Sequence, residues 1–218
     1  MNSKVQKLSK KAVREAAEAF SLQYNEHGAL PFPIEEVIEY GIGIDIVPMH
    51  GLRSKFNSDA FTLGDFKEIR IDDKLYTELP GRYRFTLAHE VGHIVLHREI
   101  LERQMLRSVE EWAEFHKSMG NAEHRELENQ ADFFANFLLM PEEQFKYILQ
   151  EKLPEIEEYV SGLKKLKTTK IEPSRIFDSA VNRIARVVVK TFDVSITAAE
   201  NKVKYAPEFN RIKLLIWK

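Results

Sequence analysis

Residues 85–97 read FTLAHEVGHIVLH, and this stretch decides the interpretation of the chain. Nearly every position outside His89, Glu90 and His93 is apolar, which is typical of a buried helix. Residues four apart lie on one helical face, so both imidazoles can bind one Zn²⁺, and Glu90 beside them can serve as a base. Gly92 costs about 1 kcal/mol relative to Ala inside a helix, which predicts that another element approaches closely there.

A catalytic zinc site needs three protein ligands and leaves a fourth position for water. The chain has no Cys, which excludes thiolate ligands and disulfides and is typical of a reducing compartment. His97 continues the four-residue spacing, but eight residues carry it about 12 Å along the helix from His89. We therefore predict that His97 lies in the core or beside a ligand, and that the third ligand comes from elsewhere.

The sequence ELENQADFFANFLLMPEEQF, residues 126–145, predicts a second buried helix that ends at Met140 and Pro141. Glu128 shares a face with Ala131 and Ala135, which are small enough to allow close helix packing. A buried carboxylate needs a cation or a proton, so Glu128 is the favoured third zinc ligand.

Two other carboxylates of the same helix have different expected roles. Asp132, one turn after Glu128, is predicted to accept the free ring N–H of a ligating His. Glu126 is the main alternative to Glu128 as a ligand, but it points about 200° away around the helix.

These two segments carry a resemblance to a known family. RYRFTLAHEVGHIVLH (residues 82–97) and ENQADFFANFLLMP (residues 128–141) resemble the ImmA/IrrE metallopeptidases, whose second motif reads E-x-x-A-[DN]-x-F-A-x-x-L-L-M-P. The likeness extends over roughly residues 10–150. An insert, residues 98–124, separates the motifs, and the C-terminal region matches loosely.

The resemblance implies specific roles for five side chains. His89, His93 and Glu128 would be zinc ligands, Glu90 the catalytic base, and Asp132 the partner of a ligating His. Members of this family are mostly intracellular, are often encoded by mobile elements or stress-response systems, and typically cleave a helix-turn-helix repressor.

The expected fold is α+β: a zincin-like metallopeptidase domain over residues 1–150, with a small antiparallel sheet and buried zinc helices, followed by a basic helical region over residues 151–218. We expect helices at residues 3–26, 33–40 and 101–119, a strand around residues 42–46, and paired strands at residues 59–63 and 68–72.

The C-terminal region holds fourteen Lys and Arg against nine Asp and Glu, whereas residues 101–150 hold five against ten. After an expected linker at residues 161–174, a helix, a turn at residues 193–195 and a second helix are typical of a helical hairpin or a helix-turn-helix. The hairpin is favoured because nothing indicates base recognition. Residues 211–218 predict a short strand or a terminal helix.

Other candidates are weaker. His116 and His124 are predicted to be surface or loop residues, and His27 and His50 to be turn residues. Tyr83, Arg84 and His124 are the candidates for stabilising the oxyanion formed during peptide hydrolysis.

No apolar run approaches roughly 18 residues, the N-terminal segment carries acids rather than a signal core, and the net charge is −2. We therefore expect a cytoplasmic, zinc-dependent endopeptidase that cleaves a helix-turn-helix repressor, with no membrane contact and with direct nucleic-acid binding less favoured. The alternatives are a non-catalytic, metal-stabilised transcriptional regulator and a module that binds a repressor without cleaving it.

Overall fold

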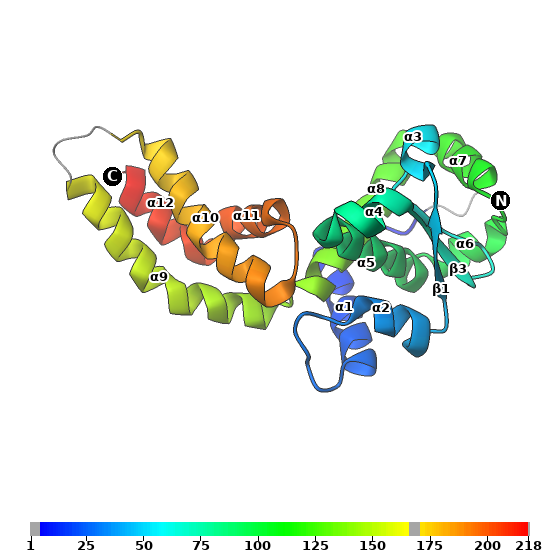
Figure 1. The fold of residues 1–218 in the computed structure, drawn as a ribbon, viewed down its shortest axis with the longest axis horizontal. Helices are drawn as coiled ribbons and strands as arrows, with labels where there is room; N and C mark the ends of the chain where they lie inside the picture. The colour runs from blue at the N-terminus through cyan, green and yellow to red at the C-terminus, as the bar shows by residue number, and fades with distance from the viewer. Residues whose placement is uncertain (1–4, 166–170, 218) are drawn as a thin grey trace. The chain divides into compact units, whose positions relative to one another are not determined.

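The computed structural model describes residues 5–165 and 171–217, which form parts of two compact units, Met1–Leu139 and Met140–Lys218. Figure 1 shows the elements of both units, and each unit is described by itself. The domain boundary predicted at residue 150 falls inside a continuous helix, α9 (Glu142–Lys165). Residues 166–170 of the predicted linker lie outside the described residues.

The first unit opens with α1 (Lys10–Tyr24), which begins later than the predicted residue 3. The reason is an N-cap: the Ser9 hydroxyl accepts a hydrogen bond from the Ala12 backbone N–H at 3.1 Å, and residues 5–9 are not helical. The second predicted helix is present after Pro33 as α2 (Ile34–Glu36), which continues into the π-helix η1 (Val37–Gly41).

The strands β1 (Asp45–Met49), β2 (Ala60–Thr62) and β3 (Glu68–Asp72) form one sheet in the order β1-β3-β2. The predicted antiparallel pairing of β2 with β3 is confirmed. However, β1 pairs with β3 in parallel, so the sheet is mixed and not purely antiparallel. A parallel pair needs a long crossover, and α3 (Leu52–Phe56) together with β2 supplies it. β2 is therefore an edge strand.

Two long helices form the centre of this unit, α5 (Pro80–Leu96) and α8 (Asn121–Leu139), and they pack against each other. A Cβ added at Gly92 of α5 would lie only 3.1 Å from the Ala131 Cα of α8. The close approach predicted at Gly92 is confirmed. The α+β class is also confirmed, with α1 packed on α8 and β2 packed on α5.

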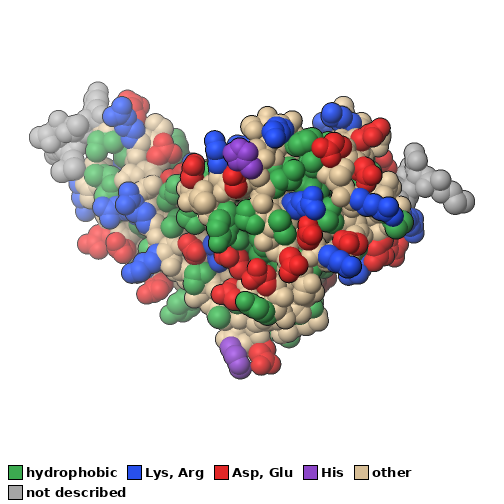
Figure 2. Space-filling model, turned by 45° about the vertical axis from the view of Figure 1, so that its right-hand side comes forward, with side chains coloured by type: hydrophobic (Ala, Val, Ile, Leu, Met, Phe, Trp, Pro, Cys, Tyr) green, Lys and Arg blue, Asp and Glu red, His purple; other side chains and the backbone are tan. Residues whose placement is uncertain are grey.

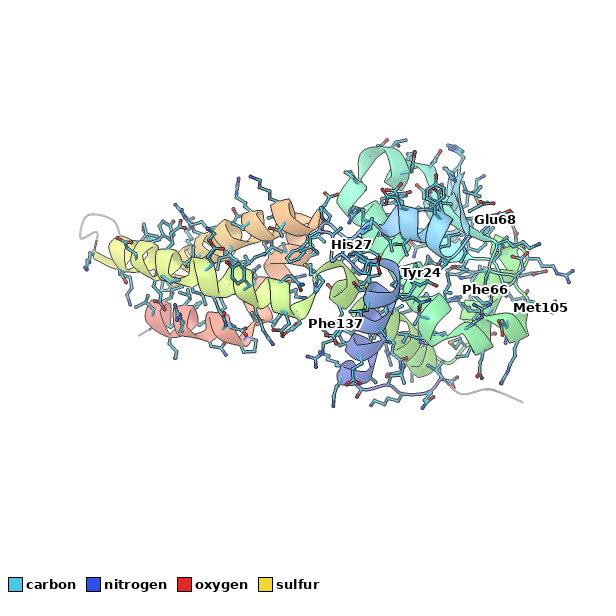
Figure 3. All side chains as sticks on the ribbon, turned by 90° about the horizontal axis from the view of Figure 1, so that it is seen from below. Tyr24, His27, Phe66, Glu68, Met105 and Phe137 are labelled. Atoms are coloured by element: carbon cyan, nitrogen blue, oxygen red, sulfur yellow. The ribbon has the colours of Figure 1, made fainter. Side chains whose placement is uncertain are left out.

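The prediction of one helix at residues 101–119 is wrong, because the chain forms two helices there, α6 (Arg98–Gln104) and α7 (Val109–Ser118). Met105, labelled in Figure 3, has a left-handed φ of 47° and is 60% exposed. Next to it, the Gly64 N–H donates a hydrogen bond to the Leu106 carbonyl at 2.8 Å. This bond connects the break between α6 and α7 to the loop after β2. α4 (Asp73–Glu78) completes the unit.

Replacing Gly64 by Ala is expected to lower the free energy of unfolding by about 1–3 kcal/mol. The new Cβ would lie 2.5 Å from the Leu106 N and 2.8 Å from the Met105 C, and backbone atoms cannot move aside as a side chain can. Urea unfolding measures the change. Gly120→Ala is the control, because its Cβ would meet only a Glu123 carboxylate oxygen, at 3.9 Å. Equal stability of the two variants would contradict the contact.

The second unit is helical. α10 (Pro173–Phe192) packs against α9, α11 (Ile196–Tyr205) and α12 (Asn210–Trp217), and η2 (Pro207–Phe209) packs on α9. The turn after α10 is present as predicted, and the Ser195 hydroxyl caps α11 by accepting from the Ala198 N–H. For residues 211–217, the helix is the correct one of the two alternatives. Among the described residues, no helix is both long and apolar enough to cross a bilayer.

Candidate metal centre

His89 and His93 of α5 and Glu128 of α8 converge. The two Nε2 atoms lie 2.9 Å apart, His89 Nε2 lies 3.4 Å from Glu128 Oε2, and His93 Nε2 lies 3.7 Å from Glu128 Oε1. Ligands about 2.0–2.2 Å from a tetrahedral zinc ion are about 3.3 Å from one another, so this set fits one ion. Glu126 does not join them, because it accepts a hydrogen bond from Gln130 instead.

Asp132 holds His89 from behind, with 2.8 Å between Asp132 Oδ1 and His89 Nδ1. Burial disfavours the His89 imidazolium, but the hydrogen bonds with Asp132 and Glu128 outweigh it and raise the pKa of His89 to about 10. Burial also acts to raise the pKa of Glu128, yet the hydrogen bond with His89 leaves that pKa lowered. The carboxylates thus favour a positive charge at this point, as a metal-binding site does.

Glu90 lies next to this candidate metal-binding group and is only 6% exposed. The Thr62 hydroxyl of β2 donates to Glu90 Oε2 at 2.7 Å. Burial raises the pKa of Glu90, although the charge of His89 and the hydrogen bonds from Thr62 oppose it. A fixed carboxylate with a raised pKa is suited to accept a proton. Sequence analysis did not find Thr62, although it is a polar residue in the otherwise apolar run Ala60–Leu63.

A chain of hydrogen bonds leads away from His93. Gln130 Nε2 donates to the Gln6 carbonyl at 2.9 Å and to Glu126 at 2.8 Å, which leaves Gln130 Oε1 to accept from His97 Nε2 at 3.0 Å. His97 Nδ1 then accepts from His93 Nδ1 at 3.1 Å. This order leaves the lone pair of His93 Nε2 directed at the metal-binding group. His97 therefore lies beside His93, a candidate ligand, which is one of its two predicted places. Sequence analysis did not find Gln130.

Replacing His97 by Phe is expected to weaken zinc binding by about 10–100-fold, because His93 loses the group that orients its ring. Helical reach alone would predict no effect, since His97 is too far from the ion to ligate. Competition with a chelating dye measures the affinity. His50→Ala is the control, because His50 lies in an exposed turn and contacts Asp73. Unchanged affinity in His97→Phe would remove the orienting role.

The prediction that His116 is a surface or loop residue is wrong. His116 lies in α7 with its side chain only 11% exposed, and its Nδ1 is 3.9 Å from Glu128 Oε1. His124 lies in the first turn of α8, with Nε2 4.0 Å from the same oxygen. The chain bends at residues 119–120, and the rings of His116 and His124 meet edge-on with centroids 4.9 Å apart. His27 and His50 lie in exposed turns, as predicted.

The site opens into a cavity of about 970 Å³, whose lining includes Glu90, Glu128 and part of β2. Of the three oxyanion candidates, His124 lines this cavity. Tyr83 instead packs edge-on against Tyr76, with ring centroids 5.3 Å apart. Arg84 donates to the Phe32 carbonyl at 2.7 Å and does not line the cavity.

Comparison with known proteins identifies the family of the chain. No curated protein matches the chain. The family model of the IrrE N-terminal-like domain, Peptidase M78, matches residues 43–170, which include α5, α8 and all three strands but not α1. The resemblance suggested that the likeness begins near residue 10, whereas the family model begins at residue 43. The matched residues make up more than half of the chain. The chain therefore belongs to the Peptidase M78 family, a family of metallopeptidases.

Proposed function

We propose that this protein is a zinc-dependent endopeptidase that cleaves a helix-turn-helix repressor. Membership of a metallopeptidase family implies a protein substrate. The single observation that carries the proposal is the convergence of His89, His93 and Glu128 in one cavity, with the buried carboxylate of Glu90 beside them. Two imidazoles and one carboxylate are the ligand set of many peptidase zinc sites.

The proposed mechanism is metal-assisted peptide hydrolysis. Zinc at this site would act as a Lewis acid and lower the pKa of a water molecule toward neutral pH. The Glu90 carboxylate accepts the proton of the attacking water and then passes it to the leaving amine. Thr62 holds Glu90 Oε2 at 2.7 Å, so the carboxylate is oriented before substrate arrives. Asp132 and His97 keep the two imidazoles in the tautomers that leave both Nε2 atoms available.

The edge strand β2 is the proposed docking place for the substrate backbone. It pairs with β3 on one side only, and Ala60 and Thr62 both line the cavity. An extended peptide can add to such an edge as a further strand, which would bring a scissile bond beside Glu90. On the face shown in Figure 2, acidic, basic and apolar side chains are interspersed, and no continuous basic surface of the kind that binds nucleic acid lies on that face.

The choice of a repressor follows from the ImmA/IrrE resemblance, and it can be tested directly. The zinc-loaded protein is incubated with the helix-turn-helix repressor encoded nearest to its gene, and the products are identified by mass spectrometry. We expect two repressor fragments, and none after chelation of the metal. An intact repressor in a stable complex would instead support the binding module, and specific DNA binding by this protein alone would support the transcriptional regulator.

A further inference from the structure

We propose that His116, His124 and Glu128 form a second divalent-metal site, so that Glu128 bridges two ions. The inference rests on the zinc site proposed above, because the two sites share this carboxylate. The ligating atoms of the second group all lie within 4.8 Å of one another, as do those of the first. The insert between the two motifs, residues 98–124, supplies both imidazoles.

Glu128 lies between the two pairs of imidazoles. Oε2 lies 3.4 Å from His89 Nε2, whereas Oε1 lies 3.7 Å from His93 Nε2 and at longer distances of 3.9 Å from His116 Nδ1 and 4.0 Å from His124 Nε2. These two longer distances exceed a hydrogen bond, but a small movement would let one ion occupy the space between the three atoms. A carboxylate with one oxygen on each ion is compatible with the roughly 3.5–4 Å spacing of two-metal hydrolytic sites.

His116 packs against aromatic rings, and among the described residues one of its ring nitrogens lacks a hydrogen-bond partner. Its ring stacks on Trp112 with centroids 4.1 Å apart, and Trp112 packs in turn on Phe61 of the sheet, 6.0 Å away. Within the described residues, the buried His116 Nδ1 has no hydrogen-bond partner. A buried polar atom without a partner is costly and calls for an explanation. A metal ion bound to this nitrogen would remove the cost.

The charges around the site also favour a second cation. The ion pairs of Glu128 within the described part of the chain are all with His side chains, and not with Lys or Arg. Glu90 and Asp132 add two carboxyl groups to the same cavity wall. An ion at the first site would still repel a second one nearby. We therefore expect stepwise binding, with the second ion held more weakly than the first.

Imidazole ligands and a bridging carboxylate suit Zn²⁺ and Co²⁺ better than Mg²⁺ or Ca²⁺. A second ion on the α7 side would add positive charge to the cavity in which the oxyanion of the tetrahedral intermediate would develop. This would give His124 a role in stabilising that charge through a metal and not by direct hydrogen bonding.

The test is a Co²⁺ titration of the full-length, metal-free protein, followed by absorption and electron paramagnetic resonance. We expect a tight first equivalent and a weaker second one, with the paramagnetic signal attenuated when both are bound, because a bridging carboxylate couples the two ions. His116→Phe keeps the stacking on Trp112 and should lose only the second equivalent. His124→Ala should do the same at a half-exposed position. His27→Ala, at a 90% exposed side chain, should retain both.

The double variant His89→Ala, His93→Ala separates this inference from the proposed function. It should lose the tight equivalent and retain the weaker one, whereas Glu128→Ala should lose both. A single equivalent in the unaltered protein, retained by folded His116→Phe, would overturn the second site and leave the first intact. Loss of activity in His116→Phe with unchanged stoichiometry would likewise overturn it and assign His116 to substrate binding. A tight equivalent that persists in the double variant would instead refute the proposed zinc site.

Discussion

Replacing Glu90 by Gln is expected to lower kcat for repressor cleavage by about 10²–10⁴-fold, while zinc affinity stays nearly unchanged. Gln has the shape of Glu and can still accept the hydrogen bond that Thr62 donates. It cannot accept a proton from water at neutral pH. The change therefore removes the base and leaves the metal ligands in place. Single-turnover cleavage and dye competition measure the two effects separately.

Glu99→Gln is the matched control for this variant, because the same chemical change falls on a side chain that is 85% exposed and pairs with Arg103. It should have the activity of the unaltered protein. Unchanged turnover in Glu90→Gln would contradict the catalytic role and favour one of the non-catalytic functions. Loss of zinc in that variant would show that Glu90 belongs to the ligand set.

Removing Glu128 is expected to have the largest effect on zinc affinity of any single change in α8. Glu128→Ala deletes one of three proposed ligands, so the loss should exceed the roughly 100-fold upper effect of an orienting residue. Asp132→Ala should weaken binding by about 10–100-fold, because Asp132 orients His89 without reaching the ion. Glu126→Ala should change affinity least, since Glu126 contacts Gln130 at the far end of the hydrogen-bond chain.

Competition with one chelating dye across these three variants gives the order directly. Circular dichroism of each variant establishes that the helices are retained. If Glu126→Ala were the most damaging change, the rotational phase of α8 relative to α5 would be wrong, and the assignment of the ligands would fail with it.

The residues of the site that could be predicted from the sequence are those whose spacing follows the period of a helix. His89 and His93 are four residues apart, and so are Glu128 and Asp132, and each pair shares a face whatever the rest of the fold does. The small size of Gly92 and Ala131 likewise predicts a close contact between the two helices that carry them. His124 carried the same signal, because it precedes Glu128 by four residues, but it was not recognised as part of the series.

The rest depends on contacts between segments far apart in the chain. Thr62 meets Glu90 only because β2 packs on α5, and no local pattern records that pairing. His116 comes near Glu128 because the chain bends between α7 and α8. The break at Met105 was missed for a related reason: the apolar spacing continues across it, and its hydrogen bond is to Gly64 of a distant loop.

The contact between Gly92 and Ala131 also has a consequence for metal selectivity. A Cβ added at position 92 would lie only 3.1 Å from Ala131 Cα. Gly92 therefore sets how close α5, which carries the imidazoles, lies to α8, which carries the carboxylate. We expect that separation to select ions by their radius, since zinc needs ligands at about 2.0–2.2 Å and calcium at about 2.3–2.6 Å. A bulkier residue at position 92 would increase the separation of the two helices. The metal preference of the site would then shift toward larger ions, with no candidate ligand altered.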